Sequence, residues 1–171
     1  MRSEKAAAEA TKLLVEFNIT EAPVPVDQIA KRMGVDLRFS PLDDELSGMV
    51  FIKDGTPIIG INSLHHSNRQ RFTIAHELGH FVLHRNEITN TVHVDKQFRV
   101  LLRDSVSAQG TDRLEIEANR FAAALLMPKH LVLKAIAESI SDIDDDTPVA
   151  ELAKKFKVSR QTMEYRVRNL A

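Results

Sequence analysis

A metal-binding pattern lies within a helical repeat near the middle of the chain. Residues 68 to 84 carry apolar side chains at the spacing of one helix face, and they include His-Glu-Leu-Gly-His at positions 76 to 80. On a helix, His76 and His80 project from the same face, so both imidazoles can reach one ion at the ~2.0–2.1 Å that zinc requires. Glu77 lies beside that face, where its carboxylate can accept a proton from a metal-bound water. The spacing therefore predicts two ligands and a general base.

Composition limits the donors that such a site can use. The 171 residues include no Cys, which excludes disulfides, thiolate zinc clusters, iron–sulfur centres and cysteine nucleophiles. A metal site must therefore be built from His, Asp or Glu. The alternative is that the two histidines lie on the surface of a helix that also carries a glutamate, but the apolar opposite face favours a metal site.

A catalytic zinc site needs a third protein ligand, and a second helical pattern at about residues 112 to 127 offers one. Glu115 and Asn119 share one face of this helix, whereas Glu117 is rotated by about 200° from Glu115. We expect Glu115 to be the third ligand and Asn119 to orient His76 or Glu115 by a hydrogen bond. The alternative is that Glu115, close to the expected helix start, only caps it.

Charge and hydropathy exclude two broad classes of protein. The chain has 23 Lys and Arg against 24 Asp and Glu, a formal net charge of −1. This balance excludes a protein that binds nucleic acid or anionic membranes over its whole surface. The first residues are charged where a signal peptide needs an apolar run, and no window approaches the ~18 apolar residues of a membrane span. We expect a soluble, cytoplasmic protein with no membrane partner.

The remaining patterns predict an α+β fold. Residues 35 to 40 alternate apolar and polar side chains as a half-buried strand does. Two apolar runs at 48 to 52 and 58 to 61 flank Asp54-Gly55, a pair typical of a β-hairpin turn. Residues 86 to 110 show no clear period and are interpreted as a variable insertion. Further helices are expected at 3 to 17, 112 to 127 and 128 to 138.

The end of the chain has its own charge pattern. Residues 138 to 146 hold five carboxylates and no base, whereas six basic and two acidic residues follow after residue 147. Residues 149 to 170 have the pattern of helix, turn and second helix, with Ser159 as the N-cap of the second. We therefore divide the chain into a domain of residues 1 to 146 and a helix-turn-helix-like subdomain of residues 147 to 171 packed on it. This subdomain either binds DNA directly or contacts a protein substrate, and its small basic excess favours the second.

Two long blocks of the sequence resemble the ImmA/IrrE family of metallo-endopeptidases. The first block is residues 69 to 84, around the two histidines, and the second is residues 115 to 128, which begin Glu-Ile-Glu-Ala-Asn. Shorter matches at Pro23-Val24-Pro25-Val26, Leu46-Ser47-Gly48 and Ile61-Asn62 extend the resemblance to about residues 6 to 170. The resemblance implies that His76, His80 and Glu115 are the ligands and Glu77 the base.

The resemblance also implies a fold and an activity. The fold is a minimal zincin-like α+β domain with a small mixed or antiparallel sheet, a helix carrying the histidines and a helical C-terminal subdomain. The activity is gluzincin-like, Zn²⁺-dependent cleavage of a protein, typically a helix-turn-helix repressor of stress, phage or mobile-element genes. Mn²⁺ or Fe²⁺ are alternatives, because metal selectivity also depends on availability. The competing hypothesis is a non-enzymatic regulator with a structural metal, which acts on DNA or protein through the C-terminal segment.

Three further features are candidates for substrate contacts. His84 follows His80 by one helical turn and can hydrogen-bond substrate or a ligand. Tyr165, the only tyrosine, is a candidate oxyanion donor, the alternative being a core aromatic of the last helix. A substrate strand can also pair with an exposed edge of the hairpin near residues 60 to 62, unless these residues are ordinary sheet interior.

Overall fold

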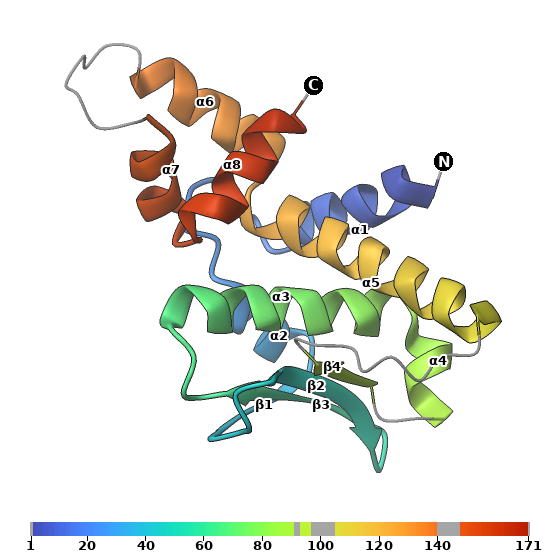
Figure 1. Ribbon diagram of the computed structural model, residues 1–171. Helices are drawn as coiled ribbons and strands as arrows, with labels where there is room; N and C mark the ends of the chain where they lie inside the picture. The colour runs from blue at the N-terminus through green and yellow to red at the C-terminus, as the bar shows by residue number, and fades with distance from the viewer. Residues whose placement is uncertain (1, 91–92, 97–104, 140–147, 171) are drawn as a thin grey trace.

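The computed structural model of the chain describes residues 2 to 90, 93 to 96, 105 to 139 and 148 to 170 (Figure 1). In these ranges the helices are α1 (Arg2–Glu16), α2 (Val26–Arg32), α3 (Ser67–Leu83), α4 (Arg85–Asn90), α5 (Ser105–Leu126), α6 (Lys129–Ser139), α7 (Pro148–Phe156) and α8 (Arg160–Arg168). The strands are β1 (Asp36–Ser40), β2 (Leu46–Lys53), β3 (Thr56–Asn62) and β4 (His93–Lys96). The α+β class is thereby confirmed.

The four strands form one small mixed sheet in the order β1-β3-β2-β4. β2 and β3 are the predicted hairpin, and the turn between them has Asp54 and Gly55 at positive φ. β4 pairs antiparallel with β2, whereas β1 pairs parallel with β3. The predicted mixed sheet is therefore confirmed.

The predicted exposed edge at residues 60 to 62 is wrong. Gly60 pairs with Arg38 of β1 on one side and with Met49 of β2 on the other, so β3 lies in the interior of the sheet. The physical reason is the parallel addition of β1, a non-local pairing that the alternation of apolar residues within each strand does not reveal.

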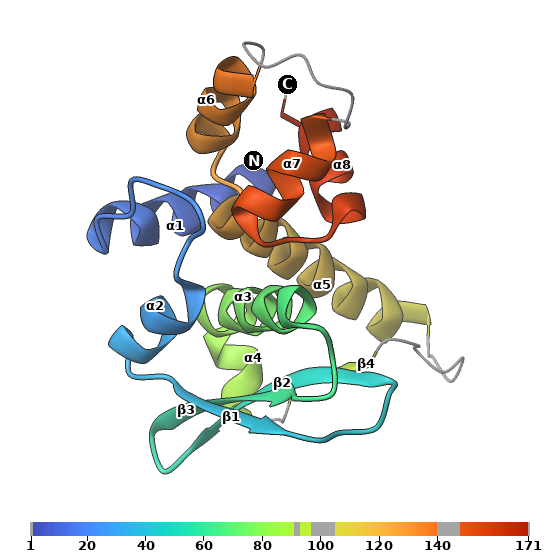
Figure 2. The same cartoon turned by 90° about the vertical axis from the view of Figure 1, so that its left-hand side faces the viewer.

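The structure is layered, with the sheet on one side of α3 and helices on the other (Figures 1 and 2). One face of α3 packs on β2 and β3, and α5 crosses its opposite face, with α1 packed against α5. Apolar side chains from all these layers form one core cluster, which includes Ile59, Ile74, Leu78, Phe121 and Leu125. The helix that carries the two histidines is therefore held from both sides.

Two glycines allow these layers to approach α3 closely. A Cβ added at Gly79 would lie 3.0 Å from Cδ1 of Phe121 and 3.2 Å from both Cα and the carbonyl oxygen of Ala118 on α5. A Cβ at Gly48 on β2 would lie 2.8 Å from the carbonyl oxygen of Gly60 and would collide with the methyl group of Thr73 on α3. Both contacts occur beside the histidine pair, so they fix the distance of α5 and β2 from it.

The segment predicted as a variable insertion, residues 86 to 110, contains regular structure instead. Most of α4 and all of β4 lie within it, and α5 begins at Ser105 rather than near residue 112. Such short elements have too few residues for a hydrophobic period to be recognised. The early start of α5 also rules out the capping alternative for Glu115, because this residue lies well inside the helix.

The C-terminal helices are anchored to the rest of the chain by two arginines. Arg71 of α3 donates from Nη2 to the carbonyl oxygen of Val24 (2.8 Å) and from Nε to that of Lys157 (3.4 Å). Arg166 of α8 donates from Nε to the carbonyl oxygen of Met127 (2.9 Å). Burial lowers the pKa of both guanidinium groups, and at Arg71 the charge of Asp27 partly opposes this shift.

The two helices α7 and α8 are joined by a short turn, and Ser159 caps α8 by accepting a hydrogen bond from the backbone N–H of Thr162, as predicted. Leu152, Phe156 and Met163 belong to the same core cluster as the rest of the chain. The helix-turn-helix-like character of the segment and the boundary at residue 146 stay predictions. Most of the acidic stretch, residues 140 to 146, lies outside the described residues.

None of the described helices combines the length and apolar character needed to cross a membrane.

The crossing of α3 and α5 predicts how the chain responds to a larger residue at Gly79. We expect Gly79→Val to lower the free energy of unfolding by about 1–3 kcal/mol, because its side chain must displace Phe121 or the backbone of Ala118. The matched control is Ala8→Val on the exposed side of α1, where valine costs less than about 1 kcal/mol of helix propensity. Urea denaturation followed by circular dichroism measures both, and equal losses in the two variants would contradict the close crossing.

Candidate metal centre

Two histidines of α3 and one glutamate of α5 bring three ligand atoms together. Nε2 of His76 lies 3.1 Å from Nε2 of His80. The two oxygens of Glu115 lie 3.2 Å from Nε2 of His76 and 3.4 Å from Nε2 of His80. Both imidazoles are buried, and the Glu115 side chain is 17% exposed. The three residues predicted as ligands are thus neighbours in space, in an arrangement that could hold a metal ion.

The spacing of the three side chains fits one metal ion. Bonds of ~2.0–2.1 Å place neighbouring ligand atoms of a tetrahedral site about 3.3 Å apart. The two imidazole nitrogens lie 3.1 Å apart, and each lies 3.2 or 3.4 Å from a different oxygen of Glu115, so one ion can reach all three side chains. Two imidazoles and one carboxylate are also the donor set of known catalytic zinc sites, which keep the fourth position open. The residues present therefore fit a divalent ion.

His76 is oriented from behind by Asn119 of α5. Nδ1 of His76 lies 3.0 Å from Oδ1 of Asn119. An amide oxygen can only accept, so Nδ1 of His76 carries the proton and its Nε2 presents a lone pair to Glu115 and His80. The contact predicted from the shared helix face of Glu115 and Asn119 is therefore present in the structure.

His80 is oriented by a longer chain of contacts through His84. Nδ1 of His80 lies 3.2 Å from Nδ1 of His84, whose Nε2 lies 2.9 Å from an oxygen of Glu117. The carboxylate of Glu117 accepts from Nε2–H of His84, so Nδ1 of a neutral His84 accepts from Nδ1–H of His80. The Nε2 lone pair of His80 then points toward His76 and Glu115. Three acceptor atoms thus face one another, and one cation would satisfy all three.

Sequence reasoning gave no role to Glu117. Its rotation of about 200° from Glu115 places it on a different face of α5, which excludes it from the ligand cluster. His84 lies one turn beyond His80 and meets this other face of α5. The sequence signal that could have found Glu117 is the continued spacing of histidines at 76, 80 and 84. His84 is buried, and both of its ring nitrogens make contacts inside the chain. The geometry therefore favours a hydrogen bond of His84 with the candidate ligand His80 over one with substrate.

Glu77 is fully buried on α3, next to His76 in the chain. Its Cγ lies near β2, 3.6 Å from the position that a Cβ at Gly48 would occupy. The glycine on β2 therefore leaves space for this carboxylate between the helix and the sheet. No other residue type would leave that space without moving Thr73 or the Gly60 carbonyl.

A family model matches most of the chain, including the residues of the candidate metal centre. The model for Peptidase M78, the IrrE N-terminal-like domain, matches residues 30 to 168. The chain belongs to this family. The resemblance found in the sequence is thereby confirmed.

A curated relative agrees with this M78 assignment, and a solved structure shares the fold. The radiation response metalloprotease IrrE of Deinococcus radiodurans is 36% identical over 142 residues, which cover 77% of this chain and 36% of that protein. The M78 chain thus spans little more than a third of this relative's length. A transcriptional regulator of Mycobacterium tuberculosis has the same fold, with a TM-score of 0.64 and 18% identity over 96% of this chain and 46% of that one.

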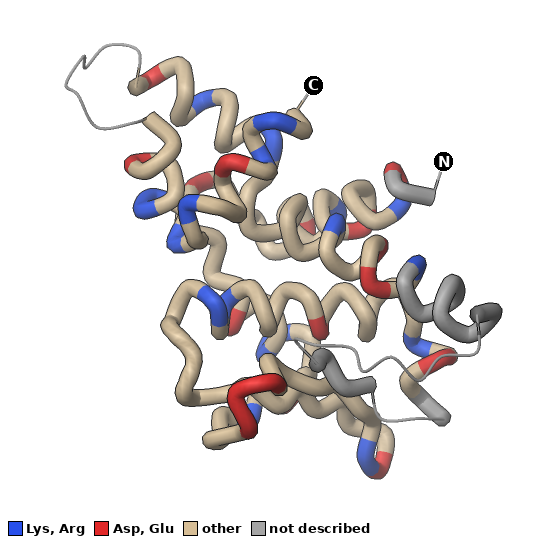
Figure 3. The backbone as a smooth tube through the Cα atoms, viewed as in Figure 1, with Lys and Arg blue, Asp and Glu red and all other residues tan. Residues whose placement is uncertain are grey.

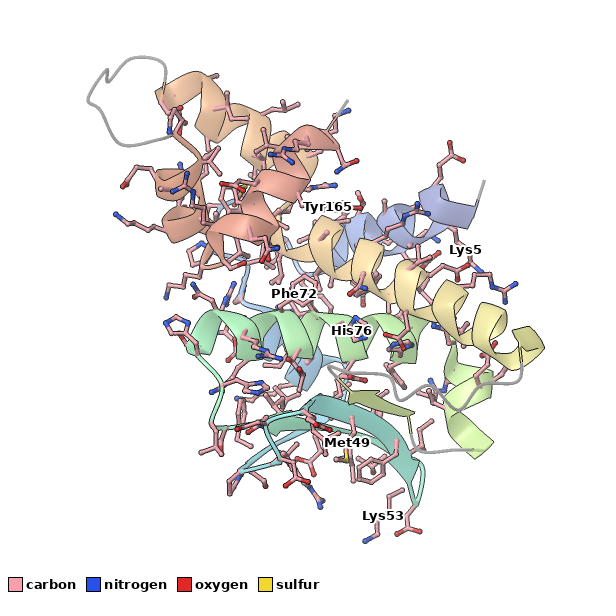
Figure 4. All side chains as sticks on the ribbon, viewed as in Figure 1. Lys5, Met49, Lys53, Phe72, His76 and Tyr165 are labelled. Atoms are coloured by element: carbon pink, nitrogen blue, oxygen red, sulfur yellow. The ribbon has the colours of Figure 1, made fainter. Side chains whose placement is uncertain are left out.

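Tyr165 lies on α8, apart from the ligand cluster of the M78 chain. Its side chain is 63% exposed, so the alternative of a core aromatic is wrong. Figure 4 shows Tyr165 extending from α8, and Phe72 and His76 from α3. Tyr165 and Phe72 line one pocket together with Asn119, the residue that contacts His76. A role of Tyr165 as oxyanion donor stays a prediction.

The contacts behind His80 predict that Glu117 affects metal affinity without binding the metal. We expect Glu117→Leu to weaken Zn²⁺ binding by at least about tenfold, because His84 loses its acceptor and His80 its fixed tautomer. Glu117→Gln keeps an oxygen acceptor and should retain most of the affinity. The measurement is competition with a chromophoric chelator.

The matched control for this series is Glu138→Leu, which removes an exposed glutamate paired with Lys155 far from the site. It should bind Zn²⁺ as the unmodified chain does. Unchanged affinity in Glu117→Leu, or the same loss in Glu138→Leu, would contradict the orienting contacts.

Proposed function

We propose that the chain is a metal-dependent endopeptidase that cleaves a protein substrate. His76, His80 and Glu115 hold the ion, and Glu77 is the general base. The observation that carries this proposal is the convergence of two buried imidazoles and one half-buried carboxylate, with neighbouring atoms 3.1 to 3.4 Å apart, beside a buried glutamate. The proposed ion is Zn²⁺, because two imidazoles and one carboxylate suit it, although availability in the cell also decides which ion is bound.

Different residues of the chain have different roles in peptide hydrolysis. When bound, a divalent ion polarises the peptide carbonyl and lowers the pKa of water toward ~7. Glu77 accepts the proton of the attacking water and delivers it to the departing amine. Asn119 and His84 keep the imidazoles of His76 and His80 in the tautomers that bind metal. The protein thus supplies a fixed base and fixed ligands, so little reorganisation is needed during the reaction.

The proposed substrate is a helix-turn-helix transcriptional repressor, whose cleavage derepresses stress, phage or mobile-element genes. Support comes from the resemblance of the chain to the ImmA/IrrE family and from its membership in Peptidase M78. A relative described as a radiation response metalloprotease is consistent with a stress function. A repressor substrate also implies that the protein acts in the cytoplasm.

The position of α8 favours protein recognition over direct DNA binding. In a DNA-binding helix-turn-helix, the second helix presents its side chains to the major groove. Here Gln161, Tyr165 and Arg168 of α8 line a pocket shared with α3 and α5. Figure 3 also shows both signs of charge along α6, α7 and α8. The face that would read DNA therefore borders this pocket.

The mechanism predicts that Glu77→Gln separates metal binding from cleavage. We expect this variant to bind Zn²⁺ like the unmodified chain but to lose at least about 10²-fold in cleavage rate, because the ligands remain and the base is removed. His80→Ala should lose both metal and activity. Co-expression with candidate helix-turn-helix repressors of the same genome, followed by immunoblotting, measures cleavage, and full cleavage by Glu77→Gln would refute the mechanism.

A gel shift with duplex DNA tests the competing hypothesis of a DNA-binding regulator. We expect binding to genomic fragments to be weak, unselective and lost as salt rises, because only a few cations of α7 and α8 can contact phosphates. Tight binding to one site at physiological salt, without cleavage of any repressor, would favour the regulator with a structural metal. A variant with Lys154→Ala and Lys155→Ala serves as the control for nonspecific phosphate contacts.

A further inference from the structure

We propose that the pocket between α3, α5 and α8 binds an apolar segment of the substrate that is flanked by acidic residues. This inference rests on the proposed function, because it assigns the pocket to the same protein substrate. The pocket has a volume of about 960 Å³, in the range of sites that enclose ligands.

The pocket adjoins the candidate metal centre. Asn119 lies in its wall and also accepts the hydrogen bond from His76. Phe72, one turn before His76 on α3, lies in the same wall, and the two rings are stacked with centroids 6.5 Å apart. The pocket therefore lies behind His76, close enough for a segment of a protein bound at the metal centre to enter it.

Large apolar side chains are exposed at this pocket. Ile116 is 49% exposed and Tyr165 is 63% exposed, and both line it. Phe72, which is partly buried, adds further apolar surface. Exposed apolar residues that gather in a concavity mark a binding site more often than exposed apolar residues scattered singly. The pocket thus favours an apolar side chain of the substrate.

The charges at the pocket are unbalanced. Glu164 is neutralised by Arg160, whose Nε lies 2.9 Å from its carboxylate, and Arg166 donates to the carbonyl oxygen of Met127. Arg120 and Arg168, which also line the pocket, are exposed and form no ion pair with any residue that the structure describes. Besides Arg166, two exposed arginines without an ion pair therefore line the pocket, one from α5 and one from α8, and they favour carboxylates of the occupant.

A protein segment fits these features better than nucleic acid does. A phosphate backbone would satisfy the two arginines but would leave Ile116, Tyr165 and Phe72 without an apolar partner. A peptide with a central apolar residue and carboxylates on both sides satisfies both sets of groups. Acidic amphipathic segments of a protein substrate are therefore the proposed occupant.

The test uses binding, so that it does not depend on cleavage. The Zn²⁺-loaded Glu77→Gln chain is titrated against fluorescein-labelled peptides with a central phenylalanine flanked by glutamates, glutamines or lysines, and anisotropy is recorded. We expect the glutamate peptide to bind most tightly, by roughly threefold for each arginine engaged, and this advantage to shrink as salt rises. Adding Arg120→Glu and Arg168→Glu should reverse the order, so that the lysine peptide binds best.

Two further variants check the charge and apolar contributions separately. Lys53→Glu changes the net charge by the same amount per residue at the hairpin turn, far from the pocket (Figure 4), and should leave the order unchanged. Ile116→Ser should weaken all three peptides by a similar factor, because it removes apolar surface and no charge. Equal affinity for the three peptides, or the same reversal in Lys53→Glu, would overturn the proposal.

The outcomes separate this inference from the proposed function. If the glutamate peptide binds as expected but the unmodified chain cleaves no repressor, the pocket stands and the endopeptidase proposal fails. If a repressor is cleaved with equal efficiency by the unmodified chain and by the Arg120→Glu, Arg168→Glu variant, cleavage stands and the pocket proposal fails. Displacement of the glutamate peptide by duplex DNA that binds more tightly through the same two arginines would also overturn it.

Discussion

The close crossing of α3 and α5 at Gly79 and Ala118 determines whether the metal centre can exist. The two histidines flank Gly79 on α3, and Glu115 and Asn119 flank Ala118 on α5. A Glu side chain is short, so it reaches the imidazoles only if the two helix backbones are nearly in contact. Gly79 permits this contact because a Cβ there would lie 3.0 Å from Phe121. The glycine is thus as necessary to the geometry as the ligands are, although it touches no metal.

The same crossing allows α5 to orient both imidazoles as well as supply a ligand. Asn119 holds Nδ1 of His76 directly, and Glu117 holds Nδ1 of His80 through His84. The two contacts lie on different faces of α5, yet both direct an Nε2 lone pair to one point. Ligands that are already oriented lose little conformational freedom when a cation binds. One helix therefore provides the third ligand and two orienting groups.

Features fixed by local geometry could be predicted from the sequence, and features fixed by long-range pairing could not. The helix of His76 and His80, the shared face of Glu115 and Asn119, and the hairpin around Asp54 and Gly55 follow from spacings of a few residues. The interior position of β3 depends on its parallel pairing with β1, which no local pattern encodes. The contact of Glu117 with His84 depends on how α5 crosses α3. Sequence spacing placed Glu117 on a different face from Glu115 but could not show that it meets His84.

Counting charges along the sequence gives a misleading view of the C-terminal segment. Its basic excess resembles that of a DNA-binding helix pair, but Lys154 pairs with Glu151, Lys155 with Glu138 and Arg160 with Glu164. Such exposed pairs add little stability, yet they cancel the field that would attract phosphate. Arg168 is left without an ion-pair partner in the part of the chain that the structure describes, and it lines the same pocket as Arg120 of α5. Part of the uncompensated positive charge therefore lies at this pocket, where it can attract carboxylates of the proposed substrate.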